Sequence, residues 1–89
     1  MKSRTTRRFR KAFAALPEDV QRQSREVYRR FRDDPTDPRL RFKRVHPTKP
    51  IYSVRVGIHY RALGVRTDDE IVWFWIGSHA DYDGLLSSL

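Results

Sequence analysis

The spacing of apolar residues predicts two helices in the first part of the chain. The first helix is expected to carry its apolar face on Phe9, Ala12, Phe13 and Leu16. Pro17 interrupts it, and Glu18 and Asp19 then supply the negative charge that suits the start of a second helix. The prolines within residues 33–38 prevent this helix from continuing. Its inner face is predicted to consist of Val20, Ser24, Val27, Tyr28 and Phe31. The two helices therefore form a hairpin.

From residue 40 onward the pattern changes to that of β-strands. Residues 40–45 alternate apolar and basic side chains, as in a half-exposed strand, and residues 51–56 and 60–66 are predicted as the next two strands. A turn at residues 67–69 leads into residues 71–77, which are apolar, aromatic or β-branched without a polar break. Such a run is typical of a central strand covered on both faces. The short connections predict an antiparallel meander.

Strict alternation along residues 71–77 places Trp73 and Trp75 on one face and Phe74 on the other, and we expect all three in the core or in a protein-binding surface. A helix is predicted to follow directly. Ser78 can cap it, Asp81 completes a capping box, and His79 and Tyr82 then share one helical face. An imidazole and a phenol therefore lie at the end of a buried strand, beside a helix N-terminus that attracts anions.

These elements predict an α+β fold. The N-terminal helical hairpin packs on one face of a four-stranded, mainly antiparallel sheet, and a short helix ends the chain. Eighty-nine residues suffice for one domain, so we expect a single domain over residues 1–89. The basic residues 1–11 are expected to form a flexible arm or a very short edge strand.

The charge balance indicates a polyanionic partner. Nineteen lysines and arginines against 11 acidic residues give a net charge of +8. Such a surface favours nucleic acid or an acidic protein, although it can also serve solubility alone. The chain has no cysteine, which excludes disulfides and thiolate zinc sites. It has no membrane-length apolar stretch and no signal-peptide pattern, so we expect a cytoplasmic protein.

The candidate site combines strand arginines with the residues at the start of the last helix. Alternation places Arg55 on the face of its strand opposite to that of Val54 and Val56. The side chain of Arg61 could point to either face, because a strand end or a bulge could turn it. If both arginines meet His79, they could hold a phosphate while the imidazole moves a proton, without a metal ion or cofactor. Tyr82 could stack on a base or orient the phosphate.

Each candidate also has a purely structural interpretation. A single arginine on a strand is usually solvated or paired with a carboxylate, His79 could merely begin a helix, and Tyr82 could merely close the core. His46 and His59 lie in loop or turn positions without metal-ligand spacing, so we exclude them from the site. No glycine-rich phosphate loop is present, which argues against nucleotide hydrolysis.

Several short sequence segments resemble those of the RelE/ParE superfamily of type II toxin–antitoxin toxins. They are Tyr52-Ser53-Val54-Arg55-Val56, Tyr60-Arg61-Ala62-Leu63 and the ending Gly77-Ser78-His79-Ala80-Asp81-Tyr82. Together with the helical hairpin, they extend the resemblance over nearly the whole chain. The resemblance implies a microbial-ribonuclease-like fold and an antitoxin that covers the toxin surface. RelE-branch members cleave mRNA in the ribosome by 2′-hydroxyl attack without metal, and ParE-branch members inhibit DNA gyrase.

The resemblance assigns roles to particular residues. Arg55 matches a basic position on the family's central strand, Arg61 its arginine after tyrosine and His79 its C-terminal basic or histidine position. Tyr82 falls near the family's C-terminal aromatic residue. These four are the expected catalytic residues, and the residues expected to contact RNA are Arg41, Lys43, Arg44 and Ser53. Ser53 stands where RelE-like enzymes often have a second lysine, which leaves the general base unassigned. The favoured hypothesis is a ribosome-dependent endoribonuclease. The alternatives are a gyrase inhibitor without nuclease activity and a degenerate module that binds only RNA or an antitoxin.

Overall fold

The computed structural model describes residues 1–89, and its elements follow the predicted order with one additional strand. The strands are β1 (Lys2–Thr5), β2 (Lys43–Arg44), β3 (Ile51–Val56), β4 (Tyr60–Thr67) and β5 (Glu70–Ser78). The helices are α1 (Arg7–Ala14), α2 (Glu18–Asp33), the 3₁₀-helix η1 (Pro38–Leu40) and α3 (His79–Ser88). The α+β prediction is confirmed. None of the helices has the length and apolar composition of a membrane-spanning segment.

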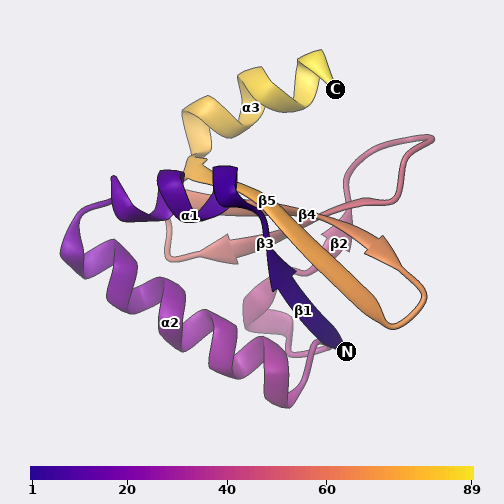
Figure 1. Cartoon of the computed structure of the whole chain (residues 1–89), viewed down its shortest axis with the longest axis horizontal. Helices are drawn as coiled ribbons and strands as arrows, with labels where there is room; N and C mark the ends of the chain where they lie inside the picture. Colours follow the sequence, from indigo (N-terminus) through magenta and orange to yellow (C-terminus); the bar gives the residue numbers. More distant parts are fainter.

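The five strands form one sheet in the order β1-β5-β4-β3-β2 (Figure 1). β2, β3, β4 and β5 are antiparallel neighbours, whereas β1 runs parallel to β5, with Lys2 opposite Glu70. The predicted four-stranded sheet therefore lacked one strand. For residues 1–11 a flexible arm and a very short edge strand were both expected, and this segment forms the edge strand β1. β5 consequently lies inside the sheet, as predicted.

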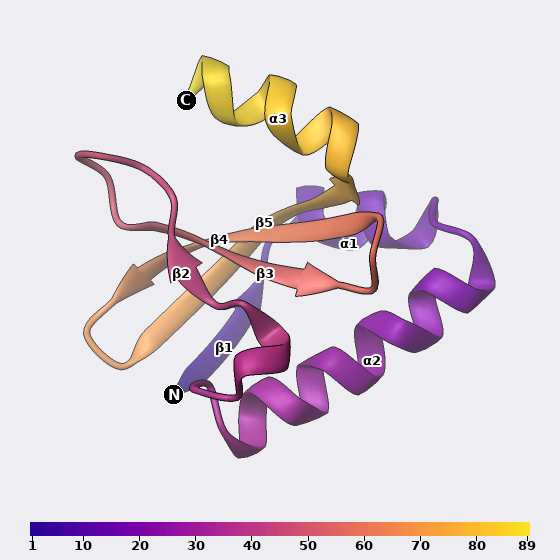
Figure 2. The same cartoon turned by 180° about the vertical axis from the view of Figure 1, so that it is seen from behind.

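Helices cover both faces of this sheet. α1 and α2 lie on one face and α3 on the other, with the sheet between them (Figure 2). Between the hairpin and the sheet, Phe31 packs edge-on against Trp73, with ring centroids 5.5 Å apart. Beneath α3 a smaller core contains Ile51, Leu63 and Tyr82. The site residues are carried by the α3 side of the sheet.

One position of the predicted helix face is wrong. Val20, Val27 and Phe31 are buried, but Tyr28 is 44% exposed. Successive helical residues are turned by about 100° from one another. When Val27 faces the sheet, the side chain of Tyr28 therefore points away from it. Tyr28 instead lies at the surface, where it lines a groove beside the hairpin.

A β-bulge changes the predicted alternation of β5. Leu63 pairs with Trp75 and Gly64 with Trp73, so Phe74 is the extra residue without a partner. Trp73 therefore packs in the core under the hairpin, whereas Phe74 and Trp75 both pack against the core under α3. The prediction that Trp73 and Trp75 share a face was wrong for this reason.

The predicted strand over residues 40–45 is reduced to the two residues of β2. Asp37 caps η1 by accepting a hydrogen bond from the Arg39 amide at 2.9 Å, and Leu40 is buried. Arg41 then turns the chain with φ of 50°, outside the range of a strand. Arg39 also donates side-chain hydrogen bonds to the Asp37 carboxylate, and these lower the pKa of Asp37 to about 2.

Candidate functional site

Strand register brings the two predicted arginines together. Arg55 of β3 pairs with Arg61 of β4, and Arg61 pairs in turn with Gly77 of β5. Residues opposite one another in an antiparallel pair share a face, so both arginines lie on the face that α3 covers. This register settles the direction of Arg61. Neither arginine forms an ion pair, although like charges directly opposite one another are unfavourable.

The start of α3 places an imidazole and a phenol beside these arginines. Ser78 caps the helix as predicted, accepting a hydrogen bond from the Asp81 amide at 3.2 Å. The backbone amide of His79 donates to the carbonyl of His59 at 2.7 Å, which ties the helix start to the turn after β3.

Tyr82 lies close to both Arg61 and His79. The Arg61 guanidinium carbon is 5.8 Å from the centre of the Tyr82 ring, and the centres of the His79 and Tyr82 rings are 5.7 Å apart. The ring itself is buried in the small core under α3. Tyr82 is therefore fixed in place, with a guanidinium over its ring and an imidazole near it.

Hydrogen bonds leave part of each charged group free. Arg55 Nε donates to the carbonyl oxygen of Gly57 at 2.9 Å, which leaves its terminal nitrogens available. His79 Nδ1 lies 3.3 Å from a carboxylate oxygen of Asp83, one helical turn further on. If Nδ1 carries the proton in this contact, Nε2 is the free acceptor. The site thus offers guanidinium donors and a nitrogen able to take a proton.

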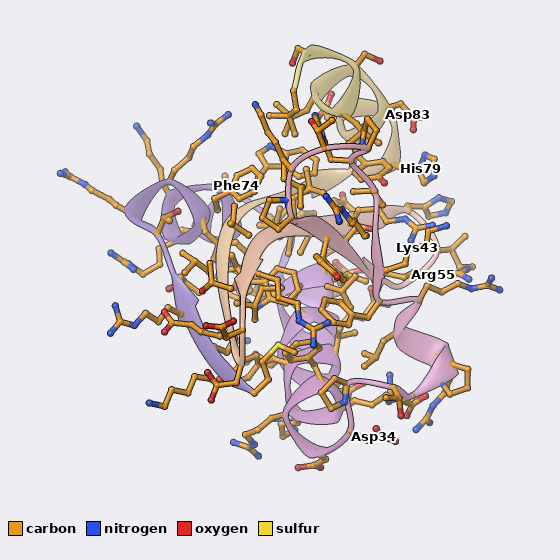
Figure 3. All side chains as sticks on the ribbon, turned by 90° about the vertical axis from the view of Figure 1, so that its right-hand side faces the viewer. Asp34, Lys43, Arg55, Phe74, His79 and Asp83 are labelled. Atoms are coloured by element: carbon orange, nitrogen blue, oxygen red, sulfur yellow. The ribbon has the colours of Figure 1, made fainter.

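The four predicted RNA-contacting residues are not brought together. Lys43 pairs with Ser53 and shares the face of Arg55, and Figure 3 shows Lys43, Arg55 and His79 on one side of the molecule. Arg41 is exposed in the turn after η1. Ser53 is 0% exposed and its hydroxyl has no hydrogen-bond partner, so this structure does not place it where RNA could reach it.

Arg44 lies on the other face of the sheet, opposite Tyr52. Its Nε donates to the carbonyl oxygens of His46 and Lys49, which holds the loop after β2. The His46 ring accepts hydrogen bonds from the backbone amides of Thr48 and Lys49 in the same loop. No group of three or more histidine, aspartate or glutamate side chains is placed to hold a metal ion.

A groove between the hairpin and the sheet was not predicted. This apolar groove has a volume of about 360 Å³ and is lined in part by Phe9, Phe13 and Tyr28. Arg25 and Arg29 also line it, and the Arg25 guanidinium lies 5.5 Å from the centre of the Phe13 ring. The one available signal in the sequence was an aromatic residue, Tyr28, at the border of the inner helix face. The groove is a second candidate for function, distinct from the arginine site.

Known proteins share this fold. Residues 18–84 match the model of the ParE-like toxin domain. A chain of the RelB–RelE antitoxin–toxin complex from Methanococcus jannaschii superposes with a TM-score of 0.74 and 14% identity, over 92% of this chain and 96% of that chain. YafQ from E. coli gives 0.72 and 10%, over 91% and 96%. A chain of the RelBE2 toxin–antitoxin complex from Mycobacterium tuberculosis gives 0.69 and 23%, over 88% and 96%. No curated protein matches the sequence.

Proposed function

The chain belongs to the ParE-like toxin domain family, within the RelE/ParE superfamily, and we propose that it cleaves mRNA on the ribosome as the toxin of a type II toxin–antitoxin system. The observation that carries this proposal is the pairing of Arg55 with Arg61, without an acidic partner, beside His79. An unneutralised pair of guanidinium groups is unfavourable in the free protein and suits a bound phosphate.

The proposed reaction is attack of a ribose 2′-hydroxyl on the adjacent phosphate. Arg55 and Arg61 bind the phosphate oxygens and stabilise the negative charge that grows on them, so a metal ion is not needed for this task. His79 exchanges a proton with the attacking or the leaving oxygen. Tyr82 holds Arg61 and His79 in position. The products are a 2′,3′-cyclic phosphate and a free 5′-hydroxyl.

We further propose that a cognate antitoxin covers the apolar groove. Exposed apolar surfaces of this kind usually mark a protein-binding site. The arginines beside the groove favour an acidic, amphipathic segment as its occupant. Two of the three structures described above are antitoxin–toxin complexes, which is consistent with such a partner.

A specific observation keeps gyrase inhibition as a second candidate. The matching domain model is described as ParE-like, and the arginines on the outer side of α2 provide a surface for a large partner that does not involve Arg55 or His79. A protein of this kind would stop growth without cutting RNA.

The decisive experiment maps transcript 5′ ends in cells that express the wild type, His79→Ala or Arg61→Ala. We expect new 5′-hydroxyl ends in translated messages, in a fixed position relative to the reading frame. Each substitution should reduce them by about 10²- to 10⁴-fold, as for loss of a proton-transfer group or a charge-stabilising donor.

His59→Ala is the matched control, because this exposed histidine lies in the turn next to the site and its side chain makes no hydrogen bond or ion pair. It should cleave like the wild type. Intact messages with arrested growth and inhibited supercoiling would establish the gyrase alternative. Intact messages with normal growth would leave a module that only binds RNA or an antitoxin.

A further inference from the structure

Lys43 is an uncommitted cation on the face of the proposed active site. It lies on β2 directly opposite Ser53, so its side chain leaves the sheet on the same face as that of Arg55. Lys43 is exposed, and its ammonium group forms no ion pair or hydrogen bond. By contrast, Arg44 is on the other face and its guanidinium is bonded to loop carbonyls.

The order of the strands places Lys43 and His79 on opposite flanks of the arginine pair. Reading across the sheet, Lys43 is on β2, Arg55 on β3 and Arg61 on β4, and His79 follows the end of β5. Lys43 is opposite the residue two positions before Arg55, and such diagonal neighbours are about 7–8 Å apart, within reach of long side chains. A phosphate held by the arginines would therefore have an ammonium on one side and an imidazole on the other.

This arrangement matches what cleavage by a 2′-hydroxyl requires. The attacking and leaving oxygens lie on opposite sides of the phosphorus atom, so the group that removes a proton and the group that supplies one must also lie on opposite sides. Arg55 and Arg61 cannot act as donors of a proton to a leaving group, because a guanidinium is not deprotonated in proteins. An ammonium can release a proton but offers no acceptor.

We propose that Lys43 is the general acid of the reaction, an inference that rests on the proposed nuclease function. His79 Nε2 takes the proton of the 2′-hydroxyl as the 2′-oxygen bonds to phosphorus. The bond from phosphorus to the 5′-oxygen breaks, and that oxygen receives a proton from the Lys43 ammonium. His79 ends protonated and Lys43 neutral, and exchange with solvent restores both because both side chains are exposed.

The test uses ribosomes programmed with a synthetic mRNA that wild-type protein cleaves at a mapped linkage. In a second mRNA, sulfur replaces the 5′-oxygen of that linkage, so the leaving group no longer needs a proton. Lys43→Ala is expected to cleave the all-oxygen mRNA about 10²- to 10⁴-fold more slowly than wild type. It should cleave the sulfur-containing mRNA at nearly the wild-type rate. His79→Ala should be slow on both.

Two further variants separate proton donation from charge and folding. Lys43→Arg keeps the positive charge but cannot donate, so it should behave like Lys43→Ala. Lys49→Ala removes a lysine from the loop after β2 and should retain full activity on both messages. Full activity of Lys43→Arg, or an equal defect of Lys43→Ala on both messages, would overturn the assignment. If wild-type protein cleaves neither message, the nuclease function itself fails.

Discussion

At the scale of single residues, the site contains two positive charges that no ion pair stabilises. Arg55 and Arg61 face each other across β3 and β4, and neither forms an ion pair with a carboxylate. Each has a local compensation, a hydrogen bond to the Gly57 carbonyl for Arg55 and the Tyr82 ring for Arg61. These contacts fix the guanidinium groups but do not neutralise them. Preorganised, unpaired cations are what an anionic transition state requires.

A double-mutant cycle between these arginines should reveal their repulsion. We expect the coupling of Arg55→Gln with Arg61→Gln to show the wild-type pair as unfavourable to stability by about 0.2–1 kcal/mol. Because screening weakens exposed charge pairs, the coupling should shrink as salt is raised. Urea unfolding of the four proteins at two salt concentrations measures it. The distant pair Arg55 and Arg8 should show no coupling, and an equally small coupling between Arg55 and Arg61 would mean that their side chains point apart.

At the scale of secondary-structure elements, the features that depend only on neighbouring residues in the sequence were predicted correctly. The bounds of β3, the break at Pro17 and the Ser78 cap follow from sequence patterns a few residues long. The Phe74 bulge could not be predicted in this way, because it depends on how β5 registers with β4. Likewise, β1 became a strand through pairing with residues about 68 positions away. The pairing of Arg55 with Arg61 could have been predicted from the sequence, since a hairpin with a short turn fixes the register of its strands.

Two glycines near the site should respond in opposite ways to alanine. A Cβ at Gly77 would lie 2.5 Å from the Trp75 indole, which covers this part of β5. We therefore expect Gly77→Ala to lower the free energy of unfolding by about 1–3 kcal/mol. Gly84 lies within α3, and no atom is within 4 Å of the place that a Cβ would take, so Gly84→Ala should raise that energy by about 0.5–1 kcal/mol.

Urea unfolding monitored by tryptophan fluorescence measures both glycine variants. Since Trp75 contacts the added methyl group, the native emission should also change in Gly77→Ala and stay constant in Gly84→Ala. Equal stability of Gly77→Ala and wild type would mean that the indole can move aside. A loss of stability in Gly84→Ala would show that α3 does not hold the helical conformation at this position.

At the scale of the whole molecule, the excess of positive charge is distributed over more than the reaction site. Arg22, Arg25 and Arg29 of α2 are exposed and follow helical spacing, so they form one stripe along this helix. This stripe is on the face of the sheet away from α3, whereas Arg55, Arg61 and His79 are on the α3 side. A protein that enters a cleft lined with RNA can use both surfaces at once, one for binding and one for cleavage.

Binding to ribosomes should therefore depend steeply on salt, and the stripe should account for a defined part of that dependence. Each phosphate contact contributes about 0.7–0.9 to the slope of the logarithm of the binding constant against the logarithm of the salt concentration. Replacing all three stripe arginines with glutamine should reduce the slope by about 2–3. The cleavage rate of bound message should stay unchanged, because the proposed catalytic residues are untouched.

Glu26→Gln on the same helix is the matched control, since it alters an exposed side chain without removing a positive charge. Its slope should equal that of the wild type. If the triple variant keeps the wild-type slope but loses affinity for the antitoxin, the stripe serves the protein partner instead. Arg25 and Arg29 also line the apolar groove, so such a result would join the stripe and the groove into one antitoxin surface. In that case, the cations on the α3 side of the sheet would account for binding to the ribosome.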